Sequence, residues 1–194
     1  EQMWPFVSHF YNDTVVEAMK NVPLPIIRSD MFRLMIVYHY GGFYSDTVVE
    51  LARSLDSFGV NWTHCSFYCE EMNDEALTQY MFGATPKHPL VGFILDHAME
   101  YLLMKGIDPS EPDVMGLAGP TAFTTRIMDY IKMKADQQGL SSLFGNYTIM
   151  GEFIAANQQW LMQHEGICMQ TYLPSIPWWD ALLGTKTKPR LIHY

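Results

Sequence analysis

The chain has few cysteines, few basic residues and no long hydrophobic run. Its three cysteines are Cys65, Cys69 and Cys168, so one pair could form a disulfide or all three are small buried apolar residues. Lys and Arg number 12 against 21 Asp and Glu, and the formal net charge of −9 argues against a nucleic-acid partner, which needs a basic face. No apolar run approaches the ~18 residues of a membrane-spanning helix, so we expect none.

The overall composition of the chain is that of a globular domain. Of the 194 residues, 48% are hydrophobic and 14% aromatic, which predicts one domain over residues 1–194 with a buried core. The first residue is Glu1 and no signal peptide is visible, so we expect a piece of a longer chain. Any membrane anchor would then lie upstream.

Three acceptor sequons for N-glycosylation are present. They begin at Asn12, Asn61 and Asn146, each followed two residues later by Thr. Because such sequons are glycosylated in the lumen of the secretory pathway, they favour a glycoprotein of that lumen.

Residues 28–50 predict a helix, a glycine turn and a short strand that ends in a carboxylate. Apolar side chains recur at i, i+3, i+4 and i+7: Met31, Leu34, Met35 and Tyr38. This spacing predicts a helix buried along one side. Ser29 or Asp30 is expected to cap its first turn, where free N–H groups favour an oxygen acceptor. Gly41-Gly42 is expected to end it, because glycine allows the positive φ of a tight reversal.

Four side chains of this stretch are candidates for a site. Asp30 and Arg33 are three residues apart, so we expect both on one side of the helix, away from its apolar stripe. Tyr44 and Asp46 are two residues apart and should share one face of the strand. Taken alone, these residues have simpler interpretations. They could be a helix cap with an exposed ion pair worth about 0–1 kcal/mol, a core tyrosine and a turn aspartate.

Beyond residue 50 the pattern predicts three more helices and two short strands. The expected elements are a helix from Asn73 or Asp74 to Phe82, helices over 89–104 and 120–135, and strands over 149–154 and 167–172. His88 precedes a proline and is predicted to be a loop or cap residue rather than a catalyst.

The spacing S-D-x-x-R at 29–33, followed by Y-G-G-x-Y-x-D at 40–46, resembles glycosyltransferase family 32. That family has a sugar-binding region with an Asp-x-Asp motif and includes fungal α-1,6-mannosyltransferases. Residues 80–89, 116–123 and 191–194 are similar to further elements of the family. The resemblance implies an α/β fold of the GT-A type, a nucleotide-diphospho-sugar transferase fold with a central, mostly parallel sheet flanked by helices. The family's first nucleotide-binding strand has no counterpart here, which again implies a fragment.

The resemblance also implies roles for individual residues. Asp30 and Arg33 would hold the hydroxyl groups of the sugar, and Tyr44 would line the nucleotide side. Asp46 would be the catalytic carboxylate that contacts the metal ion and the ribose. His193 would complete the coordination of Mn²⁺ or another divalent cation, for which an imidazole is a suitable ligand beside oxygens.

The implied function is a retaining glycosyltransferase of the Golgi or secretory-pathway lumen. Its donor would be a nucleotide sugar, GDP-mannose in the first place or a UDP-hexose, and its acceptor a glycan or glycolipid. One departure weakens this expectation, because Val48 stands where the family has the second Asp of its motif. Glu50 lies about 6.6 Å further along an extended strand, too far to replace it. The alternative is therefore a catalytically weakened, glycosyltransferase-like binding module.

Overall fold

A computed structural model describes residues 3–47, 71–72, 76–77, 79–104, 114–139, 159–165 and 167. The helices are α1 (Met3–Phe10), α2 (Asp13–Lys20), α3 (Pro25–Tyr40), α4 (Pro89–Met104), α5 (Val114–Leu117) and α6 (Pro120–Gln137), with one π-helical turn, η3 (Leu161–Glu165). The strands are β1 (Gly42–Ser45), β2 (Glu71–Met72), β3 (Ala76–Leu77) and β4 (Met81–Ala84). None of these helices combines the length and the apolar character needed to cross a membrane.

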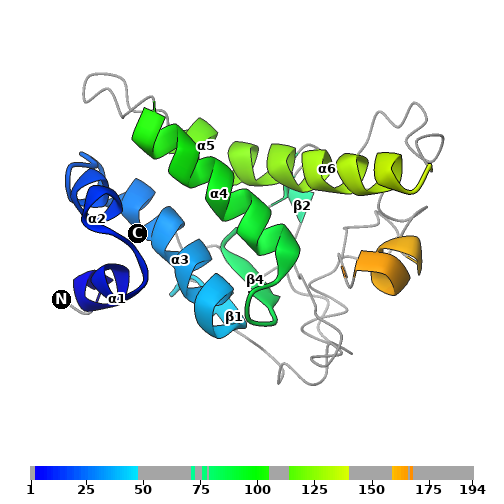
Figure 1. Cartoon of the computed structure of the whole chain (residues 1–194), viewed down its shortest axis with the longest axis horizontal. Helices are drawn as coiled ribbons and strands as arrows, with labels where there is room; N and C mark the ends of the chain where they lie inside the picture. The colour runs from blue at the N-terminus through cyan, green and yellow to red at the C-terminus, as the bar shows by residue number, and fades with distance from the viewer. Residues whose placement is uncertain are drawn as a thin grey trace, which may run out of the picture.

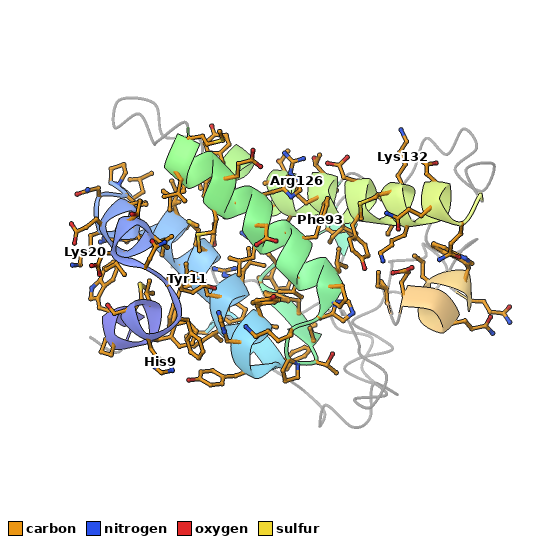
Figure 2. The ribbon with its side chains drawn as sticks, in the orientation of Figure 1. His9, Tyr11, Lys20, Phe93, Arg126 and Lys132 are labelled. Atoms are coloured by element: carbon orange, nitrogen blue, oxygen red, sulfur yellow. The ribbon has the colours of Figure 1, made fainter. Side chains whose placement is uncertain are left out.

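The three longest helices of the described structure are α3, α4 and α6. Helix α4 runs between α3 and α6 and packs against both (Figure 1). Helices α1 and α2 lie together at the outer side of α3 (Figure 1). Tyr11, between α1 and α2, points toward α3, where its hydroxyl lies 3.0 Å from Nε2 of His39 (Figure 2). The helical layer thus holds α3 from two sides.

The strands form two small antiparallel pairs. Strand β1 pairs with β4 from Gly42↔Ala84 to Ser45↔Met81, and β2 pairs with β3. The expected combination of helices and strands is therefore present. The strands of the described ranges do not form a central parallel sheet. That part of the expected GT-A fold stays a prediction.

Two of the expected helices are confirmed together with their buried faces. Helix α4 spans the predicted 89–104, and α6 begins at Pro120 as predicted and ends two residues after 135. Proline suits this first position because its missing N–H has no partner there anyway. The core side chains expected from their periodicity are all buried: Val91, Leu95, Ala98, Leu102, Phe123, Ile127 and Ile131.

The prediction of a helix that starts at Asn73 or Asp74 and ends at Phe82 is wrong. Strands β3 and β4 occupy this stretch. All four residues of β4 are buried, and a fully buried strand lacks the alternation that separates it from a buried helix in sequence. Pairing with β1, which is remote in sequence, decides the conformation here.

The expected cap of the central helix is also wrong. Helix α3 begins at Pro25, four residues before Ser29, and Leu24 precedes it in an extended conformation without a side-chain cap. The fixed φ of proline suits the first helical position. Several predictions concern residues outside the described ranges. These are the strand expected at 149–154, most of the strand expected at 167–172, the three cysteines, Asn61, Asn146, Val48 and His193.

Candidate functional site

The site begins at the turn that joins α3 to β1. Gly41 has a φ of 68°, and its N–H donates to the Val37 carbonyl over 2.8 Å. A Cβ at this position would lie 2.6 Å from Cδ of Pro86, which is closer than real Cβ atoms come. Only glycine therefore lets the chain leave α3 here and pass beside the loop before α4. The turn directs β1 back along α3.

Arg33 connects the acidic residues of the helix and the strand. Its Nη2 lies 2.9 Å from Oδ1 of Asp30 and 3.3 Å from Oδ1 of Asp46. Its Nη1 donates to the backbone carbonyl of Gln79 over 3.1 Å. The side chains of Arg33 and Asp30 are 8% and 5% exposed, and that of Asp46 is 29% exposed. One guanidinium thus bridges a buried carboxylate and a carboxylate that reaches solvent.

Tyr44 joins the same cluster from β1. Its hydroxyl donates to Oδ1 of Asp46 over 2.5 Å, and its ring centroid lies 4.6 Å from Cζ of Arg33. Burial, and then the hydrogen bond to Asp46, raises the pKa of Tyr44 to about 12. The phenol therefore stays protonated and serves as a donor to Asp46 at neutral pH. Asp30, Arg33, Tyr44 and Asp46, which the sequence singled out, lie together.

The burial of Asp30 and Arg33 corrects one expectation. We predicted an exposed pair on the side of α3 that faces away from the apolar stripe. Instead, β1 and the segment before β4 pack against α3, so α3 is buried on more than one side. Burial raises the pKa of Asp30 to about 6, although Arg33 and a hydrogen bond from the Gln79 side chain act in the opposite direction. The carboxylate is ionised at pH 7 and largely desolvated.

Sequence reasoning missed the contribution of Gln79 and Tyr80. Gln79 is 4% exposed, and its carbonyl accepts a hydrogen bond from Nη1 of Arg33. The carbonyl of Tyr80 accepts the N–H of Asp46 over 2.7 Å. The sequence does place the polar Gln79 between apolar residues. Because a helix was predicted over this stretch, Gln79 was not considered as a neighbour of Arg33.

Asp46 is the described residue best suited to contact a cation. Tyr44 and Arg33 both engage its Oδ1, so Oδ2 is the oxygen that a cation could take. Among the residues described, no group of three or more His, Cys, Asp and Glu could hold a metal ion. The donor chemistry suits a hard divalent ion, but within the described cluster Asp46 is the one carboxylate that reaches solvent, because Asp30 is buried against Arg33.

Comparison with known proteins gives two findings. Residues 3–64 match the family described as the glycosyltransferase sugar-binding region containing a DXD motif. The chain is also 24% identical, over 160 residues, to the initiation-specific alpha-1,6-mannosyltransferase of Schizosaccharomyces pombe. The expected resemblance is confirmed. That alignment covers 68% of this chain and 39% of the yeast protein, so the chain spans less than half of that relative's length.

The glycosyltransferase-like segment and the side-chain cluster coincide in part. Asp30, Arg33, Tyr44 and Asp46 lie within residues 3–64. Gln79, whose carbonyl accepts a hydrogen bond from Arg33, lies outside that segment. The chain is glycosyltransferase-like in sequence, and the roles of its individual residues are proposals.

Proposed function

We propose that this chain carries the donor-sugar site of a glycosyltransferase that moves a hexose from a nucleotide sugar to a glycan or glycolipid. One observation carries the proposal. Asp30, Arg33, Tyr44 and Asp46, to which the resemblance assigns contacts with the donor, converge from α3 and β1 in a single cluster. A helix cap, a surface ion pair and a turn aspartate would not have to meet in this way.

The proposed roles follow from burial and charge. Asp30 accepts hydrogen bonds from sugar hydroxyl groups, and Arg33 donates to them through a planar fork that its partners already hold in place. Both groups are desolvated, so each hydrogen bond to a ligand is stronger than it would be in water. Asp46, at the solvent-exposed edge of the cluster, faces the side from which a donor would enter.

We further propose a divalent cation, Mn²⁺ in the first place, as the cofactor. When bound, it would offset the negative charge that develops on the diphosphate leaving group. Asp46 would contribute one carboxylate oxygen and His193 an imidazole. Val48 offers no ligand atom where the family has a second aspartate. Tyr44 and Arg33 would keep the Asp46 carboxylate oriented by holding Oδ1.

The finer assignments rest on the resemblance. We propose GDP-mannose as the first donor to test and a UDP-hexose as the second, with retention of the anomeric configuration. The name of the yeast relative, an alpha-1,6-mannosyltransferase, supports mannose. The three sequons support a location in the Golgi or secretory-pathway lumen.

A thermal-shift panel of nucleotide sugars, with and without Mn²⁺, tests the donor site. At a hundredfold excess over Kd, a bound donor should stabilise the folded chain by about 2.7 kcal/mol. The panel should include this chain and a version extended at its N-terminus, because base contacts would come from the family's first strand. An Arg33→Lys variant, which keeps the charge but loses the fork, should shift less. If neither GDP-mannose nor any UDP-hexose shifts either version, the proposal fails.

A second function is favoured by Val48 alone. A weakened relative would bind the nucleotide sugar without turning it over. Donor hydrolysis in the presence of Mn²⁺ separates the two, because the enzyme releases free hexose slowly even without an acceptor. A donor-dependent thermal shift without hydrolysis would identify the binding module.

A further inference from the structure

One acceptor sequon for N-glycosylation lies in the part of the chain that the structure describes, at the junction of α1 and α2. It consists of Asn12, Asp13 and Thr14, and all three residues are exposed. Asn12 directly precedes α2, and its backbone is extended, with a φ of −73° and a ψ of 168°. The sequon therefore lies on the surface, where α1 and α2 meet at the outer side of α3 (Figure 1).

The side chain of Asn12 also has a structural role. Its Oδ1 accepts the backbone N–H of Val15 over 3.1 Å, which caps the first turn of α2. A backbone N–H can only donate, so the amide oxygen is the atom that must face the helix. The cap does not use the amide nitrogen, Nδ2, which is the atom that carries the sugar in an N-linked glycan. A cap and a glycan therefore use different atoms of this one side chain.

The position of Thr14 is explained by the sequon better than by the helix. Thr14 is exposed on α2, so packing of the core does not require it. Threonine is also a weak helix former, because its branched Cβ loses rotamer freedom in a helix. An asparagine cap needs no threonine two residues later, whereas the acceptor motif for glycosylation requires Ser or Thr there. Capping alone accounts for Asn12, and modification accounts for Asn12 and Thr14 together.

We propose that Asn12 is an N-glycosylation site at which one amide serves two purposes, with an oligosaccharide on Nδ2 and the helix cap on Oδ1. The inference rests on the proposed luminal location of the chain. The donor is an oligosaccharide linked to a polyprenyl diphosphate. Nδ2 forms a bond to C1 of the first sugar while the bond from C1 to the diphosphate oxygen breaks. The lipid diphosphate leaves with the electron pair, and the amide releases one proton. Oδ1 remains a carbonyl oxygen, so it still accepts the Val15 N–H.

The glycan would lie away from the donor-sugar cluster. Helix α1 packs against α3 at Phe32, whose ring centroid lies 5.4 Å from that of Phe6. Arg33 and Asp30 are one and two residues from Phe32, so they lie about 100° and about 200° around the helix axis from it. A glycan on Asn12, at the end of α1, therefore should not block access to Asp30 and Arg33.

The test is expression of the 194-residue chain behind a secretion signal in yeast, followed by mass spectrometry of the luminal or secreted protein. Peptide N-glycosidase F in heavy-oxygen water turns an asparagine that carried a glycan into a labelled aspartate. The label should appear at Asn12, should disappear in Thr14→Ala and should persist in Thr14→Ser. Asn21 is the matched control, because it is exposed at the other end of α2 but is not in a sequon, and it should stay unlabelled.

Thermal unfolding tests whether the modified amide still caps α2. Asn12→Asp removes the sequon and keeps a cap, whereas Asn12→Ala removes both, so the Tm of Asn12→Ala should be lower by roughly 2–4 °C. The glycosylated protein, trimmed to one sugar by endoglycosidase H, should unfold at least as high as Asn12→Asp. A Tm as low as that of Asn12→Ala would show that the glycan and the cap exclude each other, which overturns the double role.

The inference and the proposed function fail in different ways. Absence of the label from Asn12 in the luminal or secreted protein would overturn the glycosylation site, whatever the protein binds. A labelled Asn12 in a protein that no nucleotide sugar stabilises would instead overturn the donor site alone. If both hold, GDP-mannose should shift the Tm of the glycosylated protein and of Asn12→Asp by the same amount. Unequal shifts would contradict the separation of the two sites around α3.

Discussion

Arg33 and Asp30 form an ion pair of 2.9 Å whose side chains are 8% and 5% exposed. On α2, Lys20 and Glu17 form a pair of the same spacing and length, yet these side chains are 46% and 63% exposed. Figure 2 shows Lys20 at the outer edge of the molecule. The two pairs are alike in sequence and opposite in environment. They therefore compare a buried pair, in which Arg33 also contacts Asp46 and the Gln79 carbonyl, with an exposed pair of the same spacing.

Replacing Arg33 by Met should destabilise the protein by about 3–5 kcal/mol, because it leaves the buried Asp30 without its cation. Lys20→Met should cost only about 0–1 kcal/mol. The loss in Arg33→Met should be smaller at pH 5 than at pH 8, since Asp30, with its pKa already raised to about 6, can neutralise itself by taking a proton. Urea denaturation at both pH values measures these differences. Equal, small losses in the two variants would show that the buried pair contributes no more than the exposed one.

The acid stability of the protein should depend on His88. Its Nδ1 accepts the N–H of Leu90 over 3.2 Å at the start of α4, and burial lowers its pKa to about 4. An unfolded histidine titrates near 6.5, so between these values protons bind the unfolded chain more tightly. The contribution of His88 to the free energy of unfolding should therefore fall as pH drops from ~6.5 to ~4, whereas Asp30, whose pKa is raised to about 6, contributes in the opposite direction below pH ~6. This observed placement at a helix start agrees with the loop or cap role predicted for His88.

The matched variants for this prediction are His88→Asn and His9→Asn. Asn at position 88 keeps an acceptor for the first turn of α4 but does not titrate. Relative to the unmutated protein, this variant should therefore become more stable as pH drops from 6.5 to 4. His9 is exposed, and His9→Asn should not reproduce this relative gain. Identical slopes for His88→Asn and the unmutated protein would contradict the assignment to His88.

Two glycines with positive φ differ in how strongly the structure requires them. Gly41 has a φ of 68° with a ψ of −161°, and a Cβ there would meet Pro86, whereas Gly139 has a φ of 69° and a Cβ there would meet no described atom within 4 Å. Gly139→Ala should cost about 1–2 kcal/mol because of its positive φ. Gly41→Ala should cost a further ~1–3 kcal/mol and weaken donor binding, because its φ and ψ are open essentially to glycine only, Pro86 blocks a Cβ, and the turn directs β1. Thermal unfolding compares the two, and equal shifts would mean that the turn at Gly41 relaxes easily.

Restoring the second aspartate of the motif should strengthen metal binding. Val48 lies outside the described residues, two positions beyond Asp46 in sequence. By the resemblance, this is the position of the family's second motif aspartate, so Val48→Asp should supply a second carboxylate to the ion. Titration of Mn²⁺ in the presence of nucleotide should give a lower Kd for Val48→Asp than for the unmutated protein or Val48→Ala. If the chain is an enzyme, turnover should rise as well. Equal affinities would mean that position 48 does not face the ion.

The sequence predicted the parts of the fold that depend on local pattern. Helices α4 and α6 follow from long apolar periodicities, and the glycine turn follows from Gly41-Gly42. Strand β4 could not be predicted because its conformation depends on β1, some forty residues earlier. The same reason applies to the site. The spacing within residues 28–50 identifies Asp30 and Asp46 as candidates. The burial of Asp30 and the contact between Arg33 and the Gln79 carbonyl depend on a segment remote in sequence.

This remote contact has a consequence for synthesis of the protein on the ribosome. Arg33 and the carbonyl of Gln79 are 46 residues apart in sequence. At roughly 5–20 residues per second, α3 would emerge about 2–9 s before the segment that covers its charged side. During that interval Asp30 and Arg33 can pair with each other within the nascent helix, but Gln79 and strand β4 have not yet been synthesised. A ribosome stalled after residue 70 would therefore carry an α3 whose ion pair is still hydrated, and a donor sugar should not bind to it.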